Sequence, residues 1–227
     1  MNSSRPLASA HSATEQMIRK QENKLFFKTW LSKPMQLGTF APITSKFAHF
    51  AANKVMQSDG VKDGIVIEIG AGTGRLTRSL LAAGIKPENL IVVELDPDLC
   101  GFLRKSLPTV VPENAPSPLV IEGDAANLVS LIPAQYVGKV AAVVSVVPLM
   151  YLPLTVRERI VKAAFDVMHP AGPLFQVTYS PKSPMTFVDT INQKRTGSLW
   201  LNFPPGFVWH YTVKDAPAKH EDNCARA

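Results

Sequence analysis

The chain has 227 residues, 46% of them hydrophobic, which is enough to fill one domain core of ordinary size but not two large ones. No stretch reaches the roughly 18 consecutive apolar residues of a membrane span, and the N-terminus lacks the apolar core of a secretory signal. The two cysteines, Cys100 and Cys224, show no metal-type spacing. We therefore expect a reduced, cytosolic environment and no metal site.

The net charge of +6 is unevenly distributed along the chain. Residues 1–40 contain six basic side chains and only two acidic ones. An excess of positive charge in one segment indicates an anionic partner, which can be either a membrane surface or a nucleic acid.

The first predicted segments precede the main domain. Residues 1–12 are rich in Ser and Ala, and we expect a disordered leader there. Residues 13–33 are expected to form a basic amphipathic helix that stops before Pro34. Such a helix could bind a membrane or pack on the domain as a lid. The expected membrane-binding residues are a lysine stripe and the aromatic side chains beside it: Lys20, Lys24, Lys28, Phe26, Phe27 and Trp30.

The region 34–213 is predicted to be a single domain, followed by a flexible tail at 214–227. A helix over 44–57, capped by Thr44 or Ser45, is followed by alternating strands and helices. Near-continuous apolar runs such as 140–144 are typical of parallel strands covered on both faces. The predicted strands are 64–69, 90–94, 118–122, 140–146, 173–179 and 207–213, the last in a hairpin with about 198–203. The predicted helices are 75–83, 97–106 and 154–168.

The strongest motif is Ile65-Val66-Ile67-Glu68-Ile69-Gly70-Ala71-Gly72-Thr73-Gly74. A buried strand ends at Ile69, and a helix begins near Arg75. Glycines in the intervening turn permit positive φ angles and let a ligand approach the backbone. A turn that binds no ligand is the alternative.

Two common ligand classes do not fit this turn. A dinucleotide fingerprint needs a third glycine where Arg75 stands, and a P-loop needs a Gly-Lys-Ser/Thr ending that is missing here. Glu68, two residues before the first glycine, would repel a pyrophosphate but could accept hydrogen bonds from a cationic amino-acid ligand or its surroundings.

Acidic residues also end the next two strands. Glu94 is the last residue of the strand 90–94 and can accept hydrogen bonds from both hydroxyls of a ribose. Asp96, before Pro97, is also suited to cap the next helix. Asp124 follows the third strand and could accept an adenine amino group, with the Ala125 N–H reaching a ring nitrogen; a turn-forming role is the alternative. Because parallel strands end at one sheet edge, these carboxylates should converge.

The pattern resembles the class I S-adenosylmethionine-dependent methyltransferases, whose first motif has the form Glu-x-Gly-x-Gly-x-Gly. Within them it resembles the bacterial phospholipid N-methyltransferases from about Phe26 to Tyr211. The matching parts are Phe26 to Leu31 with Pro34, Leu37 to Pro42, Glu68 to Gly74, Glu94 to Asp96, Gly123 to Ala125, Ser145 to Pro153 and Pro204 to Trp209. The family usually has Pro-Ser-Ser at 42–44 and a Gly-Leu-Pro-type loop at 146–148, from which this chain departs.

The resemblance implies an α/β fold: a Rossmann-like, mostly parallel seven-stranded sheet with helices on both faces and a C-terminal antiparallel hairpin. It implies S-adenosylmethionine as the cofactor and S-adenosylhomocysteine as the product. The implied cofactor-binding residues come from the loop before the first helix and from the strand ends: Thr39, Phe40, Glu68, Gly70, Ala71, Gly72, Thr73, Gly74, Glu94, Leu95, Asp124, Ala125 and Ser145.

The implied reaction is N-methylation of the amino headgroup of a membrane phospholipid, from phosphatidylethanolamine towards phosphatidylcholine. An ethanolamine amine is protonated at neutral pH, so a group must accept its proton before attack. The candidate base is His210 in the last strand. Tyr151, in the loop 145–153 beside which the methyl acceptor is expected, and Tyr211 could accept a hydrogen bond from the amine or present a ring face to the methylated cation. A packing role is the alternative for each of the three. We expect a monomer in solution that acts peripherally on the inner face of the bacterial cytoplasmic membrane.

Other functions remain open. An ornithine-lipid N-methyltransferase would use the same chemistry on a different headgroup. A ribosomal RNA or other nucleic-acid amino-methyltransferase is favoured by the basic charge. It is disfavoured by Ser145-Val146-Val147-Pro148, where such enzymes carry Asn or Asp before Pro-Pro-Tyr, and by the lack of a helical domain after the last strand. A non-catalytic binder of the cofactor or of membranes is the third alternative.

Overall fold

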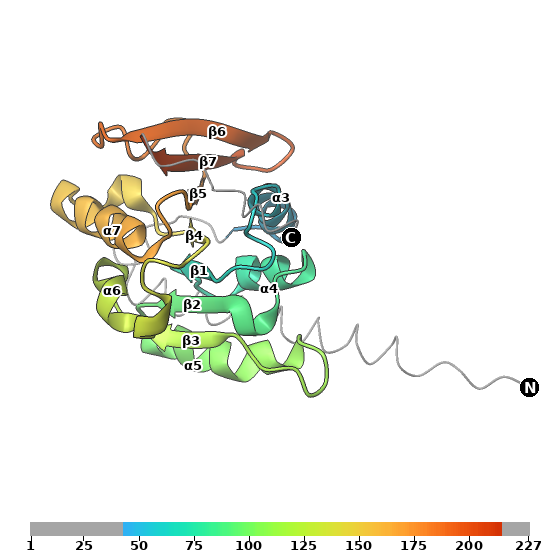
Figure 1. The fold of residues 1–227 in the computed structure, drawn as a ribbon. Coiled ribbons are helices and arrows are strands. Elements are labelled where there is room, and N and C mark those ends of the chain that lie inside the picture. Colours follow the sequence, from blue (N-terminus) through green and yellow to red (C-terminus); the bar gives the residue numbers. More distant parts are fainter. Residues whose placement is uncertain (1–42, 215–227) are drawn as a thin grey trace, which may run out of the picture.

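The computed structural model describes residues 43–214. Its centre is a seven-stranded sheet with the order β3-β2-β1-β4-β5-β7-β6 (Figure 1). The strands are β1 (Val66–Ile69), β2 (Leu90–Glu94), β3 (Leu119–Glu122), β4 (Ala142–Ser145), β5 (Leu174–Thr178), β6 (Ile191–Leu199) and β7 (Gly206–Val213).

The five strands from β1 to β5 are parallel, and β7 and β6 add an antiparallel hairpin beside β5. In the central register, Ile69 of β1 lies opposite Val93 of β2 and Ser145 of β4. Both the mostly parallel sheet and the C-terminal hairpin predicted from the sequence are confirmed.

Helices cover both faces of the sheet (Figure 1). Buried side chains of α6 (Leu128–Leu131) and α7 (Leu154–Val167) pack on one face with Ile67, Ile91 and Val143. On the other face, α3 (Ser45–Met56), α4 (Arg75–Ala82) and α5 (Pro97–Ser106) pack against Val66, Val92 and Val144. Alternate residues of the strands therefore point into two separate hydrophobic cores, one on each face of the sheet, as a sheet covered on both faces requires.

Helix starts follow the predicted capping chemistry. Asp96 caps α5, where its Oδ1 accepts hydrogen bonds from Asp98 N and Leu99 N at 2.9 and 3.2 Å, and Pro97 occupies the first helical position. Thr44 caps α3 by accepting from Phe47 N at 3.1 Å. The helix that carries Phe47 is thereby fixed at the edge of the sheet where the strands end.

The predicted hairpin partner at about 198–203 is wrong. The observed strand β6 runs over Ile191–Leu199, and residues 200–205 connect it to β7. The sequence did not predict this strand because residues 192–195 are polar and so lack an apolar pattern. They can be polar because they are exposed on the outermost strand of the sheet. The short helix α6 was also not predicted. The leader 1–12, the helix 13–33 and nearly all of the tail 214–227 lie outside the described residues and stay predictions.

Among residues 43–214, the structure contains no helix long and apolar enough to cross a bilayer.

Thr44 links α3 to the hairpin, because its hydroxyl also donates to Asn202 Oδ1 at 2.6 Å. We expect Thr44→Ala to lower the free energy of unfolding by about 1 to 2 kcal/mol, since one helix-capping acceptor and one interelement hydrogen bond are lost. Urea denaturation measures the difference. Thr44→Ser keeps the hydroxyl and should stay within about 0.5 kcal/mol of the wild type; an equal loss in both variants would contradict the capping role.

Candidate functional site

A cavity of about 800 Å³ opens at the carboxyl ends of the parallel strands. Each of the five parallel strands contributes lining residues at or just after its end, for example Gly72, Glu94, Asp124, Val147 and Thr178. This is the edge of a doubly wound sheet at which ligands bind. The volume falls in the range of small-molecule and cofactor sites, which is roughly 300 to 1,000 Å³.

The glycine-rich turn after β1 forms one wall of the cavity. Gly70, Gly72 and Gly74 have φ angles of 73°, 59° and 78°, which confirms that the turn requires left-handed backbone. A Cβ atom at Gly72 would meet no atom within 4 Å, whereas one at Gly70 would lie 2.8 Å from a methyl carbon of Val147. Gly72 therefore leaves space open beside the cavity, and Gly70 allows the loops after β1 and β4 to touch.

Glu94 closes the polar end of the cavity. Its Oε2 accepts from Gly72 N at 2.7 Å, and its Oε1 accepts from Leu95 N and Asp96 N at 2.8 and 3.0 Å. Burial raises the pKa of Glu94, and these three backbone N–H groups act against that rise. The carboxylate is held rigidly next to the glycine turn, as a group that binds ligand hydroxyls must be.

Glu68 lies beneath the same turn and is completely buried. Burial raises its pKa to about 8; Glu94 adds to the rise, while Thr77 and Arg78 on α4 counteract part of it. Among the described residues, no hydrogen bond of good geometry reaches either carboxyl oxygen. Glu68 is not among the lining residues of the cavity. Glu68 therefore lies outside the surface that a ligand in the cavity would contact.

Asp124 both caps a turn and lines the cavity. Its Oδ1 accepts from Ala126 N at 2.9 Å, which caps the short 3₁₀ turn Ala125–Asn127. Asp124 and Ala125 also line the cavity. Asp96 caps α5 and is not a lining residue, which agrees with the choice of Glu94 over Asp96.

The opposite wall of the cavity is mainly apolar. It consists of Val146 to Leu152 after β4, together with Val156 and Ile160 of α7. Tyr151 is 69% exposed and lines the cavity, which confirms the position predicted for it but not a catalytic role. Ser145 is buried below this loop, is not a lining residue, and its hydroxyl has no partner among the described residues.

Gln176 is a site residue that the sequence analysis missed. Gln176 on β5 lies opposite Ser145, the last residue of β4. It is 1% exposed and lines the cavity. Its Nε2 donates to the carbonyl oxygens of Val147 and Val177, both at 3.0 Å. The side chain thereby fixes the loop after β4. A lone glutamine inside the apolar strand Leu174-Phe175-Gln176-Val177 was the available signal.

His210, which we expected at a strand end near the mouth of the cavity, lies away from it, and so does Tyr211. Because β7 is antiparallel to β5, Phe207 lies opposite the end of β5, while His210 and Tyr211 lie opposite Phe175 and Leu174. The Tyr211 side chain is fully buried, and its hydroxyl forms a 2.8 Å hydrogen bond with Ser183 Oγ. Burial lowers the pKa of His210 and raises that of Tyr211. Neither residue lines the cavity.

The structure therefore brings most of the predicted cofactor set to one place. The residues that line the cavity are Gly70, Ala71, Gly72, Thr73, Glu94, Leu95, Asp124 and Ala125. Glu68, Gly74 and Ser145 do not line it. Thr39, Phe40 and the predicted membrane-binding residues lie outside the described part of the chain. Within residues 43–214, no cluster of His, Cys, Asp and Glu side chains could hold a metal ion.

Comparison with known proteins finds relatives among methyltransferases. No family model matches the chain. It is 30% identical over 118 residues to an ornithine lipid N-methyltransferase from Singulisphaera acidiphila, which covers 52% of this chain and 58% of that protein. It is 33% identical over 105 residues to ribosomal RNA small subunit methyltransferase A from Rhodococcus erythropolis, covering 45% and 33%. The chain thus spans less than two thirds of either relative.

Solved structures support the fold. The magnesium protoporphyrin IX methyltransferase from Synechocystis, solved with bound S-adenosylmethionine, superposes with a TM-score of 0.60 at 12% identity, covering 94% of this chain and all of that one. A precorrin-6y C5,15-methyltransferase from Geobacter metallireducens gives 0.51 at 15% identity, covering 73% and 87%. The chain therefore has the Rossmann-like methyltransferase fold.

The buried carboxyl group of Glu68 makes a pH-dependent contribution to stability. The unfolded chain ionises Glu68 near its ordinary pKa of 4.5, whereas the folded chain holds the proton up to about pH 8. The contribution of Glu68 to the free energy of unfolding should therefore fall as the pH rises between these values, and change no further above them. Glu94, whose pKa burial also raises, adds a fall of the same sign, so we expect Glu68→Gln to make the total fall smaller without abolishing it, as measured by urea denaturation at about pH 5 and about pH 9.

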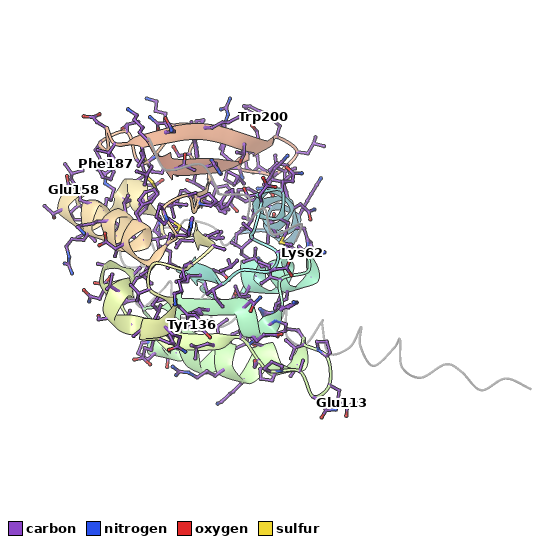
Figure 2. All side chains as sticks on the ribbon, in the orientation of Figure 1. Lys62, Glu113, Tyr136, Glu158, Phe187 and Trp200 are labelled. Atoms are coloured by element: carbon purple, nitrogen blue, oxygen red, sulfur yellow. The ribbon has the colours of Figure 1, made fainter. Side chains whose placement is uncertain are left out.

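Glu158 provides a matched control, because it is an exposed carboxyl on α7 (Figure 2). Glu158→Gln should retain the wild-type loss of stability between the two pH values. If Glu68→Gln retained it as well, the buried carboxyl would not be its source.

Proposed function

We propose that this chain is an S-adenosylmethionine-dependent N-methyltransferase that acts on the amino headgroup of a membrane lipid. Phosphatidylethanolamine is the substrate we favour, and an ornithine lipid is the alternative headgroup. The observation that best supports this proposal is a cavity with a polar, glycine-rich end and an apolar end. We further propose that the protein works peripherally on an anionic membrane and does not act on nucleic acid.

The polar end suits an adenosyl ligand with an amino-acid tail. Glu94 is positioned at the end of β2 to accept hydrogen bonds from ribose hydroxyls, and Asp124, at the end of β3, from an adenine amino group. The open space beside Gly72 admits the ligand to the backbone. When bound, S-adenosylmethionine would supply an electrophilic methyl group.

The apolar end suits a lipid amine. Side chains such as Val147, Leu149 and Val156 surround the space next to the turn. Burial among them disfavours a charged ammonium group and so lowers the pKa of the amine, which promotes loss of its proton. Attack requires the neutral amine, because its lone pair forms the new N–C bond while the S–C bond breaks and its electrons remain on sulfur.

We call the apolar wall formed by residues 146–152, Val156 and Ile160 the acceptor wall. Two side chains in or beside it have specific roles in this proposal. Tyr151, at the exposed rim, can accept a hydrogen bond from the amine and offer its ring face to the methylated cation. Gln176 is a positioning residue, because its amide holds the Val147 carbonyl at 3.0 Å and with it the loop that faces the amine. Both act on the acceptor and its surroundings, while the turn after β1 acts on the methyl donor.

The named relatives support this assignment in different ways. The Singulisphaera protein is an ornithine lipid N-methyltransferase, so its substrate is a lipid, and the similarity extends over 118 residues. The Rhodococcus relative is a ribosomal RNA methyltransferase and keeps RNA as a competing acceptor that an assay must include.

The donor half can be tested at Gly72. We expect Gly72→Leu to weaken S-adenosylmethionine binding at least about tenfold, because the new side chain would occupy the space the ligand needs. Isothermal titration calorimetry measures the affinity. Gly138→Leu is a matched control, since Gly138 also has a positive φ, 75°, with no atom within 4 Å of an added Cβ, but does not line the cavity. Equal affinity in both variants and the wild type would contradict the site.

The acceptor half can be tested with S-adenosylmethionine labelled in its methyl group. We offer the full-length chain vesicles of phosphatidylethanolamine, vesicles of ornithine lipid, and small-subunit ribosomal RNA. The label is expected in a lipid fraction, with Gly72→Leu as the inactive control. Label found only in RNA would replace this proposal with the nucleic-acid alternative, and binding without any transfer would favour a non-catalytic protein.

A further inference from the structure

The loop between β6 and β7 carries three strongly exposed apolar side chains, two of which are the most exposed large hydrophobic side chains of the described residues. Trp200, Leu201 and Phe203 are 67%, 86% and 97% exposed. They lie within four consecutive positions, and Trp200 stands at the outer edge of the hairpin (Figure 2). Large contiguous apolar surfaces of this kind are uncommon on soluble domains and mark sites of interaction. We call these three residues the apolar tip.

The apolar tip stands on an ordered base. Asn202, between Leu201 and Phe203, is only 6% exposed. Its Nδ2 donates to Pro204 O at 2.6 Å, and its Oδ1 accepts from the Thr44 hydroxyl at the start of α3, also at 2.6 Å. The loop turns its polar side chain inward and its apolar side chains outward, which is the reverse of the usual arrangement.

The part of the chain that carries the apolar tip is also the positively charged part. Residues 180–214 contain four basic residues and a single acidic one, Asp189, whereas basic and acidic residues are equal in number over 43–179. Lys194 and Arg195 lie on the hairpin itself, where both are exposed residues of the outermost strand β6. An apolar tip on a basic element complements an anionic lipid surface, which attracts lysine and arginine and accepts tryptophan at its headgroup layer.

The apolar tip also borders the cavity. Pro204, which follows Phe203 directly, is a lining residue, and so are the exposed Met150 and Tyr151 on the acceptor wall. A membrane that received the apolar tip would therefore lie next to the cavity. A lipid headgroup could then reach the cavity without the whole lipid leaving the bilayer.

We propose that Trp200, Leu201 and Phe203 form a membrane-docking surface that inserts into the headgroup layer of an anionic bilayer. This surface rests on the membrane binding in the proposed function and assigns it to particular residues, but it does not depend on which reaction the protein performs. It is also a different segment of the chain from the predicted basic helix at 13–33.

The test uses the full-length chain and vesicles of phosphatidylethanolamine with phosphatidylglycerol. We expect the triple variant Trp200→Ser/Leu201→Ser/Phe203→Ser to reduce the fraction that floats with vesicles by about tenfold or more, because three apolar side chains no longer enter the lipid. The control is Val110→Ser/Leu119→Ser/Val129→Ser, three exposed apolar residues elsewhere on the domain, which should float like the wild type. Unchanged affinity for S-adenosylmethionine verifies that the tip variant is folded.

Three results would overturn the docking surface. The tip variant could float as well as the wild type, which would leave membrane binding to another segment. The control variant could lose flotation equally, which would show a non-specific effect of lost apolar surface. The tip variant could instead abolish self-association measured by light scattering, which would make the apolar tip a contact between copies. Tip-dependent flotation without lipid methylation would uphold the surface and refute the proposed reaction.

Discussion

The site depends on backbone hydrogen bonds that continue the parallel pairing past the ends of the strands. Gly70 N donates to Val93 O at 2.9 Å, Val146 N to Ile69 O at 3.0 Å, and Gly123 N to Glu94 O at 2.9 Å. These bonds tie the loops after β1, β3 and β4 to neighbouring strands, so the loops are ordered by the sheet itself. The separation between the glycine turn, the Glu94 carboxylate and the acceptor wall then follows from strand spacing.

Within this frame, the two walls of the cavity divide the tasks of the proposed reaction. The turn at Gly72 and the carboxylate of Glu94 share a 2.7 Å hydrogen bond, which links donor recognition on β1 to that on β2. The acceptor wall relies on Gln176, whose amide supplies no charge but fixes a loop of Val and Pro residues. A polar wall can thus bind a charged ligand while the opposite wall excludes water from the amine.

The sequence predicted those parts of the site that depend on a single strand and its end. Glu94 and Asp124 were identified because each follows a short apolar run, and the parallel register then brings both to the cavity. His210 was placed wrongly because the direction of β7 against β5 is a tertiary property that the run 207–213 does not encode. Gln176 was missed for a related reason: its importance comes from Val147, a residue 29 positions away.

Fold boundaries show the same division between local and distant information. The start of α5 at Pro97 was predicted from the capping residue before it, whereas β6 has a polar sequence that only its pairing with β7 explains. Glu68 was recognised by its place before the glycines. Its complete burial, which is the main cause of its raised pKa, is a tertiary property that no spacing rule contains, and so are the contacts with Thr77 and Arg78 that counteract part of the rise.

The inward anchoring of Asn202 has a consequence for the entropy of docking. A loop that must become ordered when it binds loses conformational freedom, and this loss subtracts from the affinity. Here one hydrogen bond of Asn202 holds the loop to Thr44 at the start of α3, and a second, to Pro204, fixes the loop internally, before any partner binds. The apolar tip is therefore preorganised, and most of the free energy gained by burying Trp200, Leu201 and Phe203 remains available for holding the protein at a surface.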